Sequence, residues 1–171
     1  NTLRLRFGIR GDGPVPFAAT YLWSGGTHNA DYAANHPPID VDVPADAQKV
    51  YMVMVLSGHG QGGDDNCAEF CDHQHTFTFA DGGSVTGDHP DMGNQEGCLN
   101  QIEEGTVPNQ HGTWWFSRSS WCPGKQVDPW VWDVTEHVTP GSTETVTYTT
   151  NYSSEVDDGS IRLDTWLVSW R

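Results

Sequence analysis

The densest chemistry in the chain lies in the stretch Cys67-Ala68-Glu69-Phe70-Cys71 and in the residues that follow it, Asp72-His73-Gln74-His75-Thr76-Phe77-Thr78-Phe79. Two cysteines four positions apart can close a tight ring in an oxidising compartment, and such a ring would hold the side chain of Glu69 at a fixed angle. Successive residues of a β-strand point to opposite faces, so His73 and His75 are expected to point to the same side. We therefore predict a constrained carboxylate next to a same-side pair of histidines.

The segments around this stretch also show the patterns of β-strands. Residues Thr2 to Arg10 alternate between apolar and polar side chains, and Lys49 to Leu56 is apolar almost throughout, as in a central strand covered on both faces. No window shows a helical period, and 19 glycines and 10 prolines supply many turns. Further strands are predicted at Phe17–Trp23, Ile39–Val43, His73–Phe79, Trp114–Arg118, Pro129–Val134, Ser142–Thr150 and Ser160–Arg171. The fold class predicted is all-β: an antiparallel sandwich of eight to nine strands, a jelly roll, with loops at Ser24–Pro38 and Gly87–Gly112.

Length and charge narrow the possible partners. The 171 residues fit a single domain, residues 1–171, and 23 acidic against 8 basic side chains give a formal charge of -15. This charge repels nucleic acid and anionic membranes, because both carry phosphate groups. No apolar run reaches the ~18 residues that a membrane span needs. The chain begins at Asn1 rather than at a methionine, so we expect a mature or excised chain.

The four cysteines favour disulfide bonds over zinc. Four cysteines allow three pairings, and the close pair Cys67 and Cys71 suggests bridging. Cys98 and Cys122 stand alone in the sequence, which departs from the paired spacing of a four-cysteine zinc site. A disulfide-bridged protein is expected outside the reducing cytosol, so we predict a secreted, extracellular or periplasmic location.

Several motifs in a fixed order carry a resemblance to a known family. They are Leu56-Ser57-Gly58-His59-Gly60, the ring from Cys67 to Cys71, His75-Thr76, Gly97-Cys98 and Ser120-Trp121-Cys122-Pro123-Gly124. In this order they resemble the C-terminal domain of the F-type peptide N-glycosidases, bacterial secreted amidases that release N-glycans from asparagine. The resemblance covers nearly the whole chain. It implies an eight-stranded jelly roll of the same class as the copper-dependent peptidylglycine monooxygenases, with disulfide bonds Cys67–Cys71 and Cys98–Cys122.

The resemblance also implies roles for three side chains. Glu69 matches an acid in the family's active-site cleft, Arg118 matches an arginine that contacts the principal catalytic aspartate, and Trp121 matches a cleft aromatic. The residues themselves also allow plainer readings: Glu69 as an exposed loop acid, Arg118 in a surface ion pair, and Trp121 as packing against a disulfide bond.

Three departures from the family separate this chain from an active amidase. The principal catalytic aspartate of the family belongs to a separate N-terminal jelly roll, for which this chain has no room. His59 stands where the family has a tryptophan that would contact the glycan, and His73 stands where the family has an arginine.

The departure at His73 creates a possible metal site. Two imidazoles two residues apart on a strand can converge on one copper or zinc ion, which makes His73 and His75 candidate ligands. His59, His111 and Met92 are the candidates for a third ligand. The alternative is that His75 supports the ring while His73 faces solvent.

These observations predict a secreted jelly-roll module that binds a glycan or glycoprotein, or another extracellular domain or subunit, and that is not catalytic alone. One alternative is a peptide-N4-(N-acetyl-β-glucosaminyl)asparagine amidase that needs a second domain, with Glu69 and Arg118 in catalysis and Trp121 and His59 binding the substrate. A further alternative is a copper- or zinc-binding domain built on His73 and His75. No cofactor is required by the first two interpretations.

Overall fold

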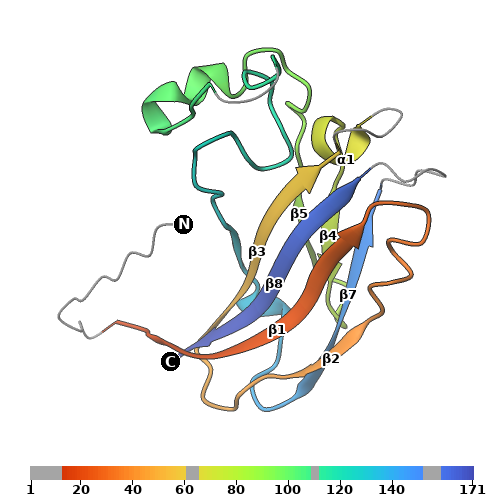
Figure 1. Cartoon of the computed structure of the whole chain (residues 1–171). Helices are drawn as coiled ribbons and strands as arrows, with labels where there is room; N and C mark the ends of the chain where they lie inside the picture. Colours follow the sequence, from red (N-terminus) through yellow and green to blue (C-terminus); the bar gives the residue numbers. More distant parts are fainter. Residues whose placement is uncertain (1–12, 61–65, 109–111, 152–158) are drawn as a thin grey trace.

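Two four-stranded antiparallel sheets face each other in the computed structural model, which describes residues 13–60, 66–108, 112–151 and 159–171 (Figure 1). The predicted strand at Thr2–Arg10 lies outside the described residues. The elements follow one another as β1 (Pro16–Thr27), β2 (Ile39–Asp42), β3 (Lys49–His59), α1 (Cys67–Phe70), β4 (His75–Thr78), β5 (Ser84–Gly87), the 3-10 helix η1 (Leu99–Glu104), β6 (Trp130–Asp133), the 3-10 helix η2 (Thr135–His137), β7 (Thr143–Thr150) and β8 (Ser160–Trp170).

The order of the strands confirms the predicted jelly roll. One sheet has the order β1-β8-β3-β6 and the other the order β2-β7-β4-β5, so the chain crosses repeatedly from one sheet to the other. Among the strands in the described residues, only β4 and β5 are both consecutive in sequence and paired, with His75 opposite Gly87. This hairpin brings the residues before β4 next to those after β5, at the end of the sandwich that carries the site.

The central strand β3 pairs with β8 over its whole length and with β6 at four positions. Its inward side chains Met52, Met54 and Leu56 are fully buried, whereas Tyr51 and Val53 on the outer face are only partly buried. The prediction of cover on both faces is therefore wrong for the outer face. Apolar side chains on this outer face pack against side chains of the neighbouring strands. Tyr51, for example, makes an edge-to-face contact with Trp170, and the two ring centroids are 5.8 Å apart.

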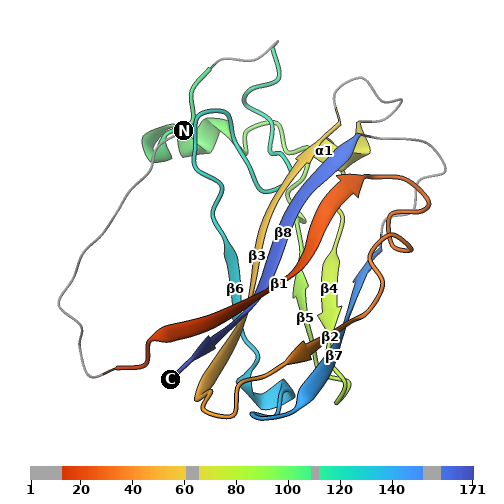
Figure 2. The same cartoon turned by 60° about the horizontal axis from the view of Figure 1, so that its bottom comes forward.

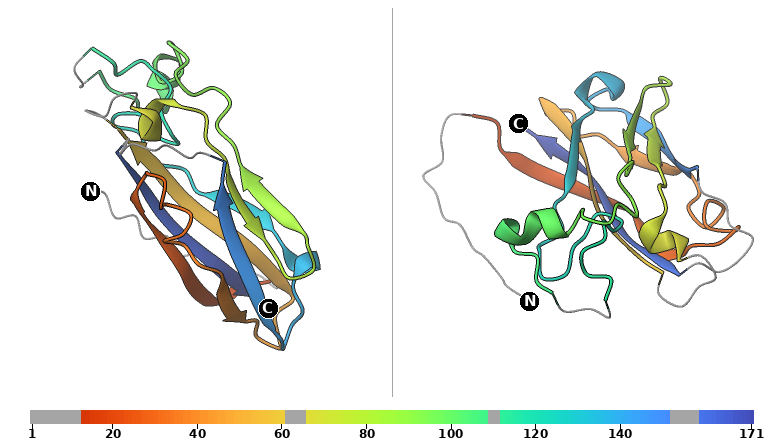
Figure 3. Two further views of the ribbon diagram at one scale, coloured as in Figure 1. Left: turned by 90° about the vertical axis from the view of Figure 1, so that its right-hand side faces the viewer. Right: turned by 90° about the horizontal axis from the view of Figure 1, so that it is seen from above.

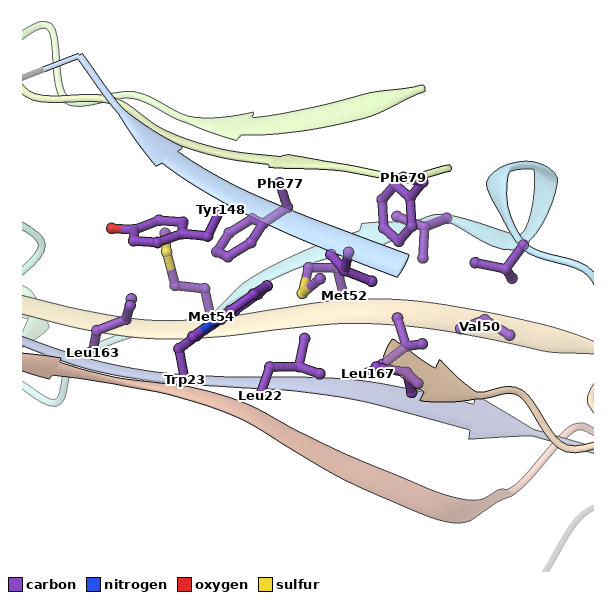
Figure 4. Packing of buried hydrophobic residues seen from close by; sticks show 14 of the residues in the cluster. Leu22, Trp23, Val50, Met52, Met54, Phe77, Phe79, Tyr148, Leu163 and Leu167 are labelled. Carbon is purple, nitrogen blue, oxygen red and sulfur yellow. The ribbon is translucent and has the colours of Figure 1, made fainter. Parts of the chain in front are cut away.

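The core lies between the two sheets and is rich in aromatic rings (Figure 4). Phe77 of β4 lies 5.2 Å from the ring of Tyr148 on β7 and 6.0 Å from that of Trp23 on β1. Each side chain of this size contributes about 1.5–3 kcal/mol when it is fully buried. The alternation of apolar residues along the strands thus drives the packing of the sheets.

Two local predictions are wrong. Trp114–Arg118 forms turns rather than a strand, because the guanidinium of Arg118 binds the carbonyl oxygens of Trp114 and Phe116 and the backbone bends around it. Residues 24–27, predicted as part of a loop, continue β1. The short strand β5 is absent from the predicted strands, and its four residues lie between a turn and the long loop. None of the helices in the described ranges is long and apolar enough to cross a membrane.

The long segment from residue 88 to residue 129 lies at the same end of the sandwich as α1 (Figures 1 and 2). Seen from above, the part of this segment that follows η1 runs between η1 and α1 (Figure 3). The disulfide bond Cys67–Cys71 closes α1, and Cys98–Cys122 ties the segment to itself. Both predicted pairings are confirmed, and no cysteine is free.

Candidate functional site

The helix α1 packs closely against the end of β3 because residue 58 is a glycine. The amide of Gly58 donates a hydrogen bond to the carbonyl oxygen of Ser119 (3.1 Å), and the amide of Ser119 donates one to that of Glu69 (3.0 Å). A Cβ atom at position 58 would overlap the carbonyl group of Ala68 and the side chain of Ser119. Only glycine permits this approach, so the sequence Ser57-Gly58-His59 fixes where α1 and its acid lie.

Glu69 and Arg118 form a buried ion pair. The Nε of Arg118 lies 2.7 Å from Oε1 of Glu69, and the two side chains are 2% and 8% exposed. The other carboxylate oxygen, Oε2, accepts a hydrogen bond from the amide of Gly60 (3.2 Å). The readings of Glu69 as an exposed loop acid and of the pair as a surface ion pair are therefore wrong.

The remaining donors of Arg118 are also engaged. Nη1 reaches the carbonyl oxygens of Trp114 (3.3 Å) and Phe116 (3.4 Å), and Nη2 donates to the hydroxyl of Thr113 (3.1 Å). The guanidinium carbon lies 5.0 Å from the ring centre of Trp121 and 5.4 Å from that of Phe70. Stacking and hydrogen bonds together fix the arginine in one position.

Trp121 and His59 lie against each other beside this pair. Their ring centroids are 4.9 Å apart, and the indole Nε1 of Trp121 donates to the carbonyl oxygen of Gly58 (2.7 Å). The ring of His59 contacts the hydroxyl of Ser57 through Nε2 (3.0 Å). Burial lowers the pKa of His59. His59 therefore packs on the aromatic side chain rather than joining the other histidines.

A pocket of about 550 Å³ opens next to Arg118 and Trp121. Its wall combines aromatic rings, a cation and several carboxylates, and includes Trp121, Trp130, Arg118, Asp88, Asp91 and Asp128. Lys125 also belongs to the wall, and its Nζ lies 2.7 Å from Oε2 of Glu104 and 3.4 Å from Oδ2 of Asp128. Such a mixture of flat apolar surfaces and polar groups is typical of sites for small polar molecules.

Behind the pocket lies a cluster of buried histidines. His73, His75 and His89 each offer a ring nitrogen, and these three atoms lie within 4.8 Å of one another. His73 and His75 are fully buried, so the reading of His73 as solvent-facing is wrong. His89 is 7% exposed and lines the pocket. The structure places the two predicted ligands together and adds a third histidine.

The other candidates for a third ligand are placed differently. His59 packs on Trp121, Met92 lines the same pocket as His89, and His111 lies outside the described residues. The signal that identifies His89 is the hairpin register: because His75 pairs with Gly87, continuing the pairing by two residues places His89 opposite His73. This register cannot be predicted without β5, which has only four residues and is absent from the predicted strands.

Burial keeps the cluster neutral. Removal from water lowers the pKa of His73 to about 3, with smaller contributions from His89 and His28. The same cause lowers the pKa of His75 well below its usual value. Burial also lowers the pKa of His89, where the carboxylates of Asp72 and Asp88 act in the opposite direction. At neutral pH the three imidazoles therefore carry lone pairs rather than positive charge.

Comparison with known proteins identifies the scaffold. A family model described as peptide-N-glycosidase F, C terminal, matches residues 27–169. No curated protein sequence matches the chain.

Solved structures share its fold at low identity. The 2.2 Å structure of peptide-N(4)-(N-acetyl-beta-D-glucosaminyl) asparagine amidase superposes with a TM-score of 0.68 at 20% identity, over 90% of this chain and 51% of that one. PNGase F from Flavobacterium meningosepticum, described as a glycosylasparaginase, gives 0.59 at 19% identity over 89% and 51%. PNGF-II gives 0.59 at 16% over 91% and 30%. This chain spans about half of the length of the first two proteins. The match of the family model over most of the chain shows that it belongs to the family of peptide-N-glycosidase F C-terminal domains.

Proposed function

We propose that this chain is an extracellular or periplasmic module that binds the N-glycan of a glycoprotein and does not hydrolyse the glycan–asparagine bond on its own. The observation that carries the proposal is the composition of the pocket. The rings of Trp121 and Trp130 offer flat apolar surfaces for sugar rings, and Asp88, Asp91 and Asp128 offer acceptors for sugar hydroxyl groups. A volume of about 550 Å³ lies within the usual range of small-molecule sites.

The buried ion pair of Glu69 and Arg118 holds the aromatic side of the pocket wall in place. Arg118 stacks on Trp121, and His59 supports the same indole ring from its own side. Rigid aromatic groups lose little conformational entropy when a ligand binds, which favours recognition. Trp121 thus contacts the glycan, and His59 acts as a positioning residue for it.

The contacts of Glu69 argue against catalysis by this chain alone. A general acid or base must reach the proton that it transfers. Both carboxylate oxygens of Glu69 are already bound, one by Arg118 and the other by the amide of Gly60, and Glu69 does not line the pocket. The pair therefore shapes the site, and Glu69 is not placed to transfer a proton to a ligand in the pocket.

The relatives and the disulfide bonds support the rest of the proposal. The asparagine amidase and the glycosylasparaginase are about twice as long as the part that this chain matches, so the shared fold accounts for about half of each protein. Two disulfide bonds are compatible with a compartment outside the reducing cytosol.

Calorimetric titration with an asparagine-linked oligomannose glycopeptide tests the proposal. The Asp91→Ala/Asp128→Ala variant removes two acceptors from the pocket wall, and we expect it to bind at least about tenfold more weakly, which corresponds to about 1.4 kcal/mol. Asp46→Ala is the matched control: Asp46 also pairs with a cation, Arg171, but lies in the β2–β3 connection at the opposite end of the sandwich (Figure 1). This variant should bind like the wild type. The absence of binding by the wild type, or equal affinity in the pocket variant, would contradict the proposal.

A further inference from the structure

We propose that His73, His75 and His89 form a site for one zinc or copper(II) ion, with a coordination position left open toward the pocket. This inference does not depend on glycan binding. It begins with the hairpin, which holds the three rings together: His75 starts β4, His73 precedes it by two residues, and His89 follows β5 opposite His73. The pairing of β4 and β5 thus places the three histidines near one another.

Hydrogen bonds to carbonyl oxygens decide which nitrogens carry protons. Nε2 of His73 lies 3.3 Å from the carbonyl oxygen of Ala68, and Nδ1 of His89 lies 3.3 Å from that of His73. Because a carbonyl oxygen only accepts, each of these nitrogens donates an N–H. In the neutral rings the lone pairs therefore lie on Nδ1 of His73 and on Nε2 of His89, where the hydroxyl of Ser120 donates a hydrogen bond that a bound ion would replace. Histidines that bind metals are commonly oriented by such a hydrogen bond from the other ring nitrogen.

His75 completes the set. Its Nδ1 lies 2.5 Å from the hydroxyl of Tyr148, which can accept an N–H, and its Nε2 lies 2.7 Å from Nδ1 of His73. At this distance the two nitrogens share one proton in a hydrogen bond, so an ion takes the place of that proton only when the two rings move apart. The same contacts also allow a chain of hydrogen bonds from Tyr148 through His75 to His73 with no ion, and this is the alternative that the experiment must exclude.

Distances and donor type suit zinc or copper(II). Two nitrogens bound to one tetrahedral zinc ion lie about 3.4 Å apart, from Zn–N bonds of about 2.05 Å. The three ring nitrogens lie within 4.8 Å of one another, so small side-chain rotations bring them to this spacing. All four cysteines form disulfide bonds, which leaves no thiolate for a softer ion. Three protein ligands leave a fourth position free, and His89 places it at the pocket wall.

The charge around the cluster favours a cation. Asp72 and Asp88 interact electrostatically with His89, and Asp88, Asp91 and Asp128 line the pocket through which an ion would enter. The positive charge of Arg118 is compensated by Glu69. Acidic side chains at the mouth of a site raise the local concentration of cations.

The test uses the full chain, stripped with EDTA, loaded separately with ZnCl₂ and CuSO₄ and desalted, with bound metal measured by mass spectrometry. We expect one ion per chain in the wild type and background levels in His89→Gln. His89 is the least buried of the three ligands, so this variant is the one most suited to fold, which circular dichroism checks. His137→Gln is the matched control, because His137 pairs with Asp81 at the opposite end of the sandwich (Figure 2); it should still bind one ion.

A second readout separates a built site from surface binding. Added metal should raise the melting temperature of the wild type and of His137→Gln with increasing concentration, but not that of His89→Gln, because only a folded site binds the ion. The copper(II) form should also show coupling to several nitrogen nuclei in its electron paramagnetic resonance spectrum. Equal metal content and equal thermal shifts in the wild type and His89→Gln would overturn the proposal and assign the cluster to the hydrogen-bonded chain.

Discussion

Glu69 on α1 and Arg118 in the long segment after β5 are joined by a 2.7 Å ion pair from which solvent is almost excluded. The two residues are 49 positions apart in sequence, so their contact links the disulfide-closed helix to the segment that forms the pocket wall. A buried charge that loses its partner is strongly destabilising, whereas removing both partners costs less.

The first prediction follows from this pair. Arg118→Met leaves the Glu69 carboxylate buried without a cation, and we expect the free energy of unfolding to fall by about 3–5 kcal/mol. Glu69→Gln should cost a similar amount because it leaves the guanidinium uncompensated. Chemical denaturation of both single variants and of the double variant measures the coupling. The double variant should lose clearly less than the sum of the single losses; additive losses would mean that the pair does not stabilise the fold as a unit.

A second prediction concerns the bridge Cys98–Cys122. It closes a loop with a sequence separation of 24, and the chain-entropy model gives a contribution of about 3 kcal/mol for a loop of this size. We expect Cys98→Ser/Cys122→Ser to lower the free energy of unfolding by about this amount, as measured in denaturant. Because both ends of the bridge belong to the segment from residue 88 to 129, glycopeptide affinity should fall as well. Retention of full stability would show that the segment is held by its other contacts.

Stability should depend on pH through the buried histidines. Burial lowers the pKa of His73 to about 3, while an unfolded histidine titrates near 6.5. Between these values the unfolded chain binds more protons than the folded one, so stability is complete above pH ~6.5 and falls as the pH decreases. The contribution of each such histidine is about 1.4 kcal/mol per pH unit.

The check is to unfold the EDTA-treated protein in denaturant at pH 7 and at pH 5.5, above the range in which most carboxylates titrate. The wild type should be less stable at pH 5.5. A His89→Gln variant should show a smaller difference between the two values, because burial lowers the pKa of His89 too. Equal stability at both values would contradict neutral burial of the cluster.

The last prediction concerns activity. We expect the chain alone not to release N-glycans from a denatured glycoprotein, because both carboxylate oxygens of Glu69 are already bound and Glu69 does not line the pocket. Glycan release is measured by mass spectrometry of the peptides, because hydrolysis converts the glycosylated asparagine to aspartate. Turnover by the wild type that disappears in Glu69→Gln, in a variant that still folds, would assign a catalytic role to this residue.

The sequence by itself determined the fold class and the covalent frame. The strands predicted at Phe17–Trp23 and Ser142–Thr150 are present in the structure as parts of β1 and β7. The motifs around Cys67–Cys71 and Cys98–Cys122 indicated both disulfide bonds through the family resemblance. These features depend on the order of neighbouring residues or on short motifs, and both can be read from the sequence.

Only the tertiary structure decided which distant side chains meet. Arg118 bends its own backbone through hydrogen bonds to nearby carbonyl groups, which no strand pattern reports, and its partner Glu69 comes from another element. His89 reaches His73 because a four-residue strand pairs with β4, and so short a strand has too few residues to show a period. Pairing register and long-range packing are properties of the folded chain, so the ion pair, the pocket and the third histidine appear only when the two sheets are assembled.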